Sequence, residues 1–401
     1  MYVCFVAQDV SFLPIWKLEI LVKCRTPRTA LLTKVSCVYN RQDRHRTAQL
    51  FIVNSMYTGK SMITFNKFHS LFFIGSMLII LLSSCSQNTI SKAEFSEKLK
   101  KTAFSINNDF SLIRKEVGRL ARFTEKLYEK NSQDKVLSEV DRSKYKISVN
   151  GVFYKPLNDG NSAVFVSGHI PVDNTIKEVV FFTEPLDREL KEIVSSYPEI
   201  VQAYYNDRFS YNRIFPYFDV LTQYEPKMNI PEFNFYYLAD QKHNPEKKAV
   251  WVKEPYVDPA GRGWMVSAIA PVYVADKLEG VSGLDVTIST ITERYIKALN
   301  NQFIILDKNG VIVSINESLT GLLSLPRLED HTYLETIKQD TYRTDNFNLL
   351  NSKSRSVREA VSAIYHEGKN EIVFIKDKEH VTILSEKIPE LDWYILLVFK
   401  S

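Results

Sequence analysis

Residues 251–288 read WVKEPYVDPAGRGWMVSAIAPVYVADKLEGVSGLDVTI and decide the fold. Short apolar runs in and around this stretch predict strands at 249–252, 263–273 and 281–288. Turn residues, and not regular helices, separate these runs, so we expect the strands to form an antiparallel sheet. The stretch therefore indicates the sheet of an α+β domain.

Upstream of this sheet the sequence predicts one long amphipathic helix. Apolar residues recur there at helical spacing, and they are Leu99, Ala103, Ile106, Phe110, Ile113, Val117, Leu120 and Leu127. The pattern spans about 35–40 residues, which is longer than the usual globular helix. We expect the helix to run along the flank of two stacked modules, and a coiled-coil dimer seam is a compatible alternative.

The remaining elements indicate a larger α/β unit followed by a smaller one. In the larger unit we expect further strands at 147–154, 163–168, 179–182 and 200–205, a helix at 185–197 and another at 290–299. In the smaller unit we expect strands at 303–306, 311–315, 371–376, 381–387 and 393–399. The residues Asp307-Lys-Asn-Gly310 form a tight-turn signal between the first two of these strands.

An export signal precedes the long helix. From Met62 the sequence reads MITFNKFHSLFFIGSMLIILLSSC, in which Lys67 precedes an apolar run at 71–82. That run spans about 18 Å as a helix, well short of a hydrocarbon core of about 30 Å. It is typical of a secretory signal, and Leu82-Ser-Ser-Cys85 resembles a lipobox. We expect Cys85 to carry the lipid; the alternative is an uncleaved anchor or a buried helix that ends in cysteine.

Residues 1–61 differ in composition from the rest of the chain. They hold nine Lys or Arg against three Asp or Glu, and three of the four cysteines. We interpret them as a non-native upstream extension, with the true start at Met62 or Met56; a genuine cytosolic segment is the alternative. These residues carry a net charge of +6, and Lys67 adds one more positive charge. Because the whole chain has a net charge of +4, the part from Cys85 onward carries −3. This balance gives no support to nucleic-acid binding.

The 251–288 stretch resembles the double Cache family, the extracytoplasmic sensor domain of many bacterial chemoreceptors and histidine kinases. The similarity is carried by Trp251-Val-Lys-Glu-Pro-Tyr-Val-Asp258, Met265-Val-Ser-Ala-Ile-Ala-Pro-Val-Tyr273 and Gly280-Val-Ser-Gly-Leu-Asp-Val-Thr-Ile288. Residues 198–205 and 391–398 are similar to two further strands of the family. The resemblance covers roughly residues 90–401. It implies a long N-terminal helix followed by a membrane-distal and a membrane-proximal PAS-like module with antiparallel sheets.

The resemblance also implies ligand-binding residues. In members that bind amino acids, an Arg and aromatic residues hold the carboxylate and an Asp takes the amine. Tyr237, Tyr256 and Asp285 match an aromatic position, the second Tyr and the Asp. Tyr236 stands where the pattern has Trp, and Asn234 stands where it has Arg. An amine, a neutral polar solute or a ligand held by another cation therefore remains open.

Further candidates for ligand contact are Arg213, as that other cation, and Tyr205 and Trp251 as pocket walls, with Tyr204 beside them. Each candidate also has a structural interpretation. The aromatic residues can belong to the core, Asp285 can cap the turn near Thr290, and Arg213 can pair with Asp207 or Asp219.

No catalytic or metal-binding motif is evident. The five histidines after Cys85 are scattered without an H-E-x-x-H pattern, and neither G-x-G-x-x-G nor an EF-hand loop occurs. No cysteine follows Cys85, which excludes disulfides and cysteine-based metal sites there. We therefore expect no enzyme, no cofactor and no metal.

Together these features predict a domain plan: 1–61 extension, 62–84 lipoprotein signal peptide, 85–135 anchor, tether and long helix, 136–299 distal module, and 300–401 proximal module. The chain stops at Ser401 after the last predicted strand, so we expect no output domain. The predicted function is small-molecule binding or sensing by a lipoprotein in the cell envelope, periplasmic or at the surface. It would present its ligand or its ligand-bound state to a membrane signalling partner, and it is a candidate homodimer. The alternatives are an envelope interaction lipoprotein with a vestigial pocket, and a truncated receptor.

Overall fold

The computed structural model describes residues 2–3, 15–26, 29–40, 49–53, 92–133, 140–296, 302–325 and 347–400. The predicted signal peptide and Cys85 lie outside the described residues. The chain divides into two units, Met1–Thr89 and Ile90–Ser401. In the first unit four antiparallel strands form one sheet in the order β1 Tyr2–Val3, β2 Ile15–Thr26, β3 Thr29–Asn40 and β4 Gln49–Val53. Within the part of the chain that is described, no helix combines the length and the apolar character that crossing a membrane requires.

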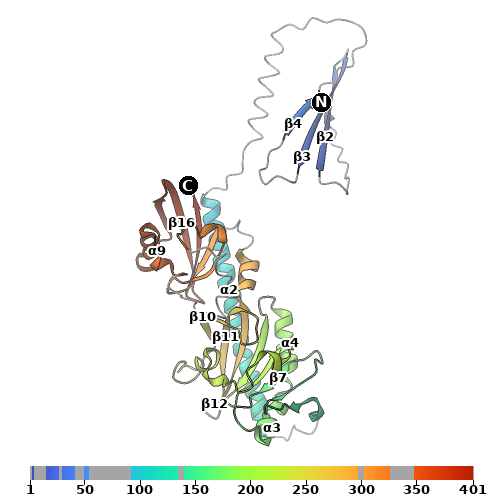
Figure 1. Ribbon diagram of the computed structural model, residues 1–401, viewed down its shortest axis with the longest axis vertical. Coiled ribbons are helices and arrows are strands. Elements are labelled where there is room, and N and C mark those ends of the chain that lie inside the picture. Colours follow the sequence, from blue (N-terminus) through green and yellow to red (C-terminus); the bar gives the residue numbers. More distant parts are fainter. Residues whose placement is uncertain are drawn as a thin grey trace. The chain divides into compact units, whose positions relative to one another are not determined.

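The second unit is built along one helix, α2 Lys92–Gln133, of 42 residues. Figure 1 shows α2 running past both sheets of this unit. Its apolar stripe from Leu99 to Leu120 is buried, as the helical spacing predicts. Phe95 stacks on Phe399 of the smaller sheet at 5.2 Å between ring centroids, and Phe110 lies 4.9 Å from Trp251 of the larger sheet. The prediction of a long helix that flanks two modules is therefore confirmed.

The larger sheet has eight antiparallel strands in the order β10-β11-β12-β8-β9-β7-β6-β5. They are β5 Lys146–Ile147, β6 Phe153–Tyr154, β7 Ala163–Val166, β8 Gln202–Asp207, β9 Tyr211–Phe215, β10 Val250–Val257, β11 Trp264–Val274 and β12 Lys277–Thr287. The predicted strands of the 251–288 stretch are β10, β11 and β12, and they pair in sequence order. Strand β9 was not predicted.

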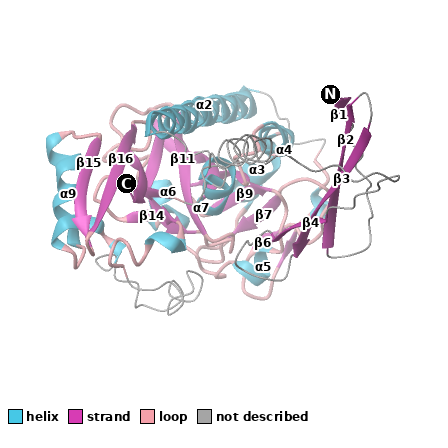
Figure 2. Ribbon diagram, turned by 90° about the horizontal axis from the view of Figure 1, so that it is seen from above, coloured by secondary structure: helices cyan, strands magenta, loops and turns pink. Residues whose placement is uncertain are grey.

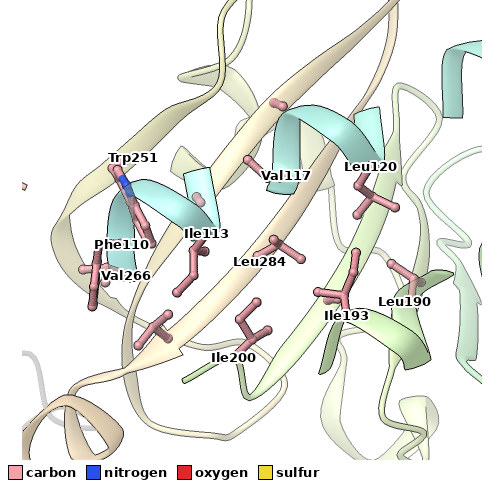
Figure 3. Packing of buried hydrophobic residues seen from close by; sticks show 14 of the residues in the cluster. Phe110, Ile113, Val117, Leu120, Leu190, Ile193, Ile200, Trp251, Val266 and Leu284 are labelled. Atoms are coloured by element: carbon pink, nitrogen blue, oxygen red, sulfur yellow. The ribbon is translucent and has the colours of Figure 1, made fainter. Parts of the chain in front are cut away.

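One face of the larger sheet packs against helices. α3 Asn174–Phe182 and α4 Leu186–Ser196 lie on the same face as α2, and their apolar residues join one continuous core (Figures 2 and 3). The predicted helix at 185–197 is α4. The predicted strand at 179–182 is wrong, because these residues form the end of α3. Asp173 caps that helix by accepting a hydrogen bond from the Ile176 amide, and a short buried helix has the same apolar run as a buried strand.

The opposite face of the larger sheet is covered by the segment 216–249. This segment contains the short helices α5 Val220–Gln223, η3 Ile230–Glu232 and α6 Asn234–Tyr237. Apolar residues from the segment and the sheet form a second, smaller core. A sheet covered on both faces explains why its central strands are buried throughout.

The smaller sheet has five antiparallel strands in the order β14-β13-β17-β16-β15. They are β13 Phe303–Leu306, β14 Ile312–Ile315, β15 Glu371–Lys376, β16 Glu379–Ile388 and β17 Trp393–Lys400. Helix α9 Arg355–Glu367 covers one face and α2 contacts the other. The connection from the larger to the smaller sheet contains α7 Ile288–Ile291 and a π-helical turn, η4 Thr292–Ile296. The other single helical turns of this unit are η2 Arg142–Lys144, η6 Glu317–Leu319 and η9 Leu349–Asn351. The expected α+β class, a long helix followed by two antiparallel-sheet modules, is confirmed.

Candidate ligand-binding site

A cavity lies between the larger sheet and the segment 216–249. Strands β8, β9, β10 and β12 supply its floor, and η3 and α6 contribute to its cover. Its free space is about 20 Å³, room for one water molecule. The lining residues are Gln202, Tyr204, Asn206, Asn212, Ile214, Tyr224, Met228, Ile230, Phe235, Tyr256, Asp258, Pro259 and Asp285.

The alternation of side chains along a strand decides which residues of β8 reach the cavity. Gln202, Tyr204 and Asn206 point into it. Tyr205 points to the α2 face, where its hydroxyl lies 2.7 Å from that of Tyr128. The predicted wall residue Tyr205 is thus in the core, and its neighbour Tyr204 lines the cavity.

Four polar side chains form a chain of hydrogen bonds at the cavity floor. The Tyr256 hydroxyl lies 2.5 Å from Ser267 Oγ, which donates to Asp285 Oδ1 at 2.5 Å. Gln202 Nε2 donates to Asp285 Oδ2 at 2.6 Å. Both oxygens of this 1% exposed carboxyl group are therefore engaged. The structure thus brings together two of the predicted ligand residues, Tyr256 and Asp285.

A second carboxyl group, that of Asp258, lines the same cavity. It accepts hydrogen bonds from the backbone amides of Ala260 at 2.9 Å and Arg262 at 3.1 Å. Burial raises the pKa of Asp258. Burial, and next the negative charge of Asp258, raise the pKa of Asp285 to about 8.

A glycine allows Tyr204 to lie across the cavity floor. Gly283 on β12 pairs directly with Tyr204 on β8. A Cβ atom at Gly283 would come within 2.0 Å of Tyr204 Cζ, so the ring occupies the space of the missing side chain. This contact gives a physical reason for glycine in the Gly280-Val-Ser-Gly motif.

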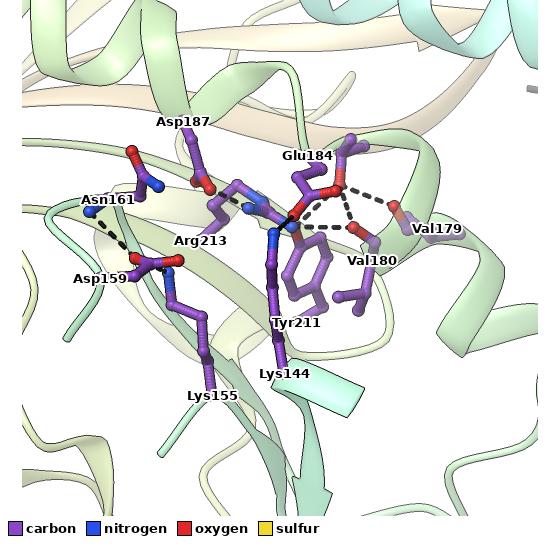
Figure 4. Close-up of polar contacts among 11 residues, drawn as sticks. Lys144, Lys155, Asp159, Asn161, Val179, Val180, Glu184, Asp187, Tyr211 and Arg213 are labelled. Atoms are coloured by element: carbon purple, nitrogen blue, oxygen red, sulfur yellow. Dashed lines mark hydrogen bonds and ion pairs between the residues drawn. The ribbon is translucent and has the colours of Figure 1, made fainter. Parts of the chain in front are cut away.

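Arg213, the candidate cation, faces away from the cavity. It lies on β9, and Figure 4 shows its guanidinium among residues of the α3 and α4 face. It donates to Asp187 Oδ1 and the Tyr211 hydroxyl, both at 2.6 Å, and to the Val180 carbonyl at 2.8 Å. Its partner is therefore Asp187, and neither Asp207 nor Asp219 takes that role. The fully buried guanidinium is held by groups of the protein itself and stabilises the fold.

The other aromatic candidates lie outside the cavity lining. Trp251 packs in the α2 core (Figure 3), and its Nε1 donates to Glu390 Oε1 of the smaller module at 3.2 Å. Tyr236 is a buried residue of α6, and Tyr237 of the same helix is 36% exposed with its ring 5.2 Å from that of His243.

Several lining residues were not predicted, among them Gln202, Asn206, Asn212 and Asp258. The period-two pattern of β8 places Gln202, Tyr204 and Asn206 on one face and carries a signal that could have found them. Asn212 comes from the unpredicted strand β9. In the part of the chain that is described, no group of three or more His, Cys, Asp or Glu side chains could hold a metal ion.

No protein-family model matches the chain, and no curated protein matches it. Solved structures match at low identity. One is the extracellular domain of a protein described as a histidine kinase, with 11% identity and a TM-score of 0.44 over 82% of this chain and 97% of that domain. Another is the ligand-binding domain of the Pseudomonas aeruginosa PAO1 amino acid chemoreceptor PctB in complex with L-Arg, with 13% identity and a TM-score of 0.39 over 76% of this chain and 93% of that domain. The ligand-binding domain of the chemoreceptor PctC in complex with GABA has 18% identity and a TM-score of 0.38 over 76% of this chain and 97% of that domain.

Proposed function

We propose that this protein is a lipid-anchored binding protein of the bacterial cell envelope, which takes a small molecule with a protonated amino group into the cavity of its larger module. The observation that supports this most directly is the acidic character of the lining. Two buried carboxyl groups, Asp258 and Asp285, line the cavity, and no Lys, Arg or His is among the lining residues.

The hydrogen-bonding groups of the floor favour a donor-rich ligand. Gln202 donates its amide to Asp285, and its own Oε1 is buried without a hydrogen-bond partner among the described residues. An ammonium group has three donors and no acceptor, so it can satisfy this oxygen together with a carboxylate. A ligand carboxylate would meet two acidic groups and no cation among the lining residues, which disfavours organic acids as ligands.

The size of the cavity limits what enters without rearrangement. The free space of about 20 Å³ holds a group of the size of water, such as an ammonium. The carbon skeleton of the ligand requires the covering segment 216–249 to move outward. This segment is built from three short helical turns, α5, η3 and α6, which makes it the part of the cavity wall that opens most easily.

Location and anchoring rest on the sequence. The signal-like segment 62–84 and the lipobox-like residues before Cys85 support export and lipidation. We infer that the anchored protein presents its ligand-bound state to a membrane partner. Labelling cells with a radioactive fatty acid tests the anchor: we expect label on the wild-type chain and none on Cys85→Ser. A labelled Cys85→Ser variant would exclude this anchor.

Calorimetric titration of the purified full chain tests the ligand class. Each primary amine is compared with the alcohol of the same carbon skeleton, because only the amine is cationic. We expect saturable binding of at least one amine and none of its alcohol. A ligand at about 100 times its Kd stabilises the native state by about 2.7 kcal/mol, so thermal unfolding gives a second measurement.

Two variants with the same chemical change complete the test. Asp285→Asn removes a carboxyl group from the cavity, and Asp377→Asn removes an exposed one in the smaller module. We expect amine binding to be lost in Asp285→Asn and retained in Asp377→Asn. Equal binding of amine and alcohol would refute the proposed ligand class. A folded protein that binds none of the amines would favour the alternative of an envelope interaction protein with a vestigial pocket.

A further inference from the structure

A second hollow lies along α2, outside the cavity. It is a groove between the α2 residues 114–125 and the residues 247–249 and 270–271, with a volume of about 380 Å³. Its walls carry five basic side chains, which are Arg114, Lys115, Arg122, Lys247 and Lys248. We call it the basic groove.

The basic groove is positively charged, whereas the chain around it has a net negative charge. From Cys85 onward the chain carries −3, yet five cations converge here and one acidic residue, Glu125, is among the lining residues. Glu125 Oε1 accepts a hydrogen bond from the Tyr273 backbone amide at 3.3 Å, and burial raises its pKa. The charge of Arg122 acts in the opposite direction and lowers the pKa of Glu125. Even with Glu125 ionised, the five cations leave the lining with an excess of four positive charges.

Two of the five cations have no ion-pair partner. Among the described residues, no carboxylate lies within ion-pair distance of Lys115 or Arg122, which stand two turns apart on α2. The remaining cations pair at the groove's edges: Arg114 with Glu390, Lys247 with Asp276 and Lys248 with Glu246. The last two pairs are held by exposed carboxylates, which a stronger anion can replace.

The floor of the groove is open because its residues are small. Gly118 and Ala121 of α2 face Ala249, Ala270 and Pro271. A Cβ atom at Gly118 would lie 3.6 Å from Ala249 Cβ and 3.6 Å from a guanidinium nitrogen of Arg122. The cationic walls therefore surround a hollow that no large side chain of the lining fills.

The wall opposite α2 is held in place by a buried side chain. Asn244 is 5% exposed; it donates to the Lys248 carbonyl at 2.7 Å and accepts from the Lys248 amide at 3.3 Å. Lys247 lies in this turn, and its Nζ lies 4.3 Å from the centre of the Tyr273 ring. The turn that carries Lys247 and Lys248 is thus fixed at the wall of the groove, and both ammonium groups pair with exposed carboxylates, those of Asp276 and Glu246.

We propose that the basic groove binds a small anion with two or more negative charges, a multivalent phosphate or polycarboxylate. The two unpaired cations on α2 and the two lysines of the opposite turn would hold it from both sides, and the small floor gives it room. A monovalent anion can engage one wall at a time and binds more weakly. This site is independent of the proposed amine cavity, because the two share no lining residue.

Calorimetric titration of the full chain with pyrophosphate, citrate and acetate at low ionic strength tests the site. We expect saturable binding of pyrophosphate, citrate or both, and acetate weaker by at least about tenfold. The two multivalent probes distinguish phosphate from carboxylate chemistry. The double variant Lys115→Gln/Arg122→Gln is expected to weaken the binding by at least about tenfold.

The matched control is Lys100→Gln/Lys353→Gln, which removes the same charge from two exposed positions outside the groove. We expect it to change the affinity by less than about twofold, because distant exposed charges are screened. Three results would overturn the proposal: no saturable binding of either multivalent anion, equal affinity for acetate, or equal weakening in the control. Circular dichroism verifies that both double variants keep the wild-type unfolding midpoint, which their exposed positions lead us to expect.

Discussion

Replacement of Asp285 by Asn should flatten the pH dependence of folding stability. In the folded chain the pKa of Asp285 is about 8, because of burial and the charge of Asp258, whereas an unfolded Asp titrates near pH 3.9. At a pH between these two pKa values, Asp285 is protonated in the folded state and ionised in the unfolded state. The stabilisation from this group is therefore complete below about pH 4 and is lost as the pH rises toward 8.

The size of this effect follows from the two pKa values. A difference of about 4 pKa units corresponds to about 5 kcal/mol, of which about 4 kcal/mol is lost between pH 5 and pH 8. Burial also raises the pKa of Asp207 to about 7, so this group too contributes stability that is lost as the pH rises toward 7. Asp285→Asn keeps the Asp207 contribution, and the difference between wild type and variant isolates Asp285.

Urea denaturation followed by circular dichroism at pH 5, 6, 7 and 8 measures the effect. We expect the free energy of unfolding of the wild type to fall more steeply with pH than that of Asp285→Asn, so that the variant gains relative stability at pH 8. The free Oε1 of Gln202 can turn toward the new amide and accept its hydrogen bond. Asp377→Asn should follow the wild-type curve. Parallel curves for the wild type and Asp285→Asn would refute the assigned pKa and its cause.

The remaining predictions concern the ligand, the cavity floor and the buried arginine. Amine affinity should rise about tenfold per pH unit up to about pH 8, as the cavity carboxyl ionises, and calorimetry at several pH values checks this; a flat profile would contradict it. Gly283→Ala should destabilise the fold by about 1–3 kcal/mol through the clash with Tyr204, whereas Gly321→Ala, with nothing within 4 Å of its new Cβ, should be nearly neutral in urea denaturation. Arg213→Met should destabilise by about 3–5 kcal/mol by leaving Asp187 without its cation, yet keep the affinity for amines at temperatures where it is folded. Loss of affinity in the folded Arg213→Met variant would show that the arginine contributes to the site.

The sequence predicts most of the fold because its strongest patterns are long. The stripe of α2 and the strands of the 251–288 stretch repeat over many residues, and all of these elements are present. β11 matches its predicted bounds within one residue, whereas β10 ends five residues later and β12 begins four residues earlier than predicted. Strand β9 was missed because Tyr211–Phe215 reads YNRIF, in which a buried arginine interrupts the apolar pattern. Helix α9 was not predicted, although Val357, Val361 and Ile364 recur at helical spacing and indicate an amphipathic helix.

The candidate site could be predicted only in part. The period of two groups Gln202, Tyr204 and Asn206 on one face of β8, but in a sheet covered on both faces it does not say which face holds the cavity. Tyr204 and Tyr205 are chemically identical neighbours, yet one lies in the cavity and the other in the α2 core. Asp285 and Tyr256 were found through the family resemblance. Arg213 differs from its cavity-lining neighbour Asn212 by one position on β9, and the partner that fixes its direction, Asp187, lies on α4.

The two faces of the larger sheet separate stability from binding. The α2 face holds the core that extends into the smaller module, where the Trp393 indole donates to the Lys253 carbonyl of β10 at 3.1 Å. The cavity face holds a smaller core under short helical turns. Because short turns with few buried contacts open at lower free energy than a continuous core, the cover can move while the α2 face stays packed. Strand β10 contacts both the cavity and the smaller module, because Tyr256 reaches the cavity and Lys253 contacts the smaller module. Its pairing with β11 has a register shift between Val252 and Tyr256. Two residues, Glu254 and Pro255, separate Tyr256 from Lys253 within this irregular part of the strand, so a displacement of Tyr256 can be absorbed there before it reaches the junction between the modules.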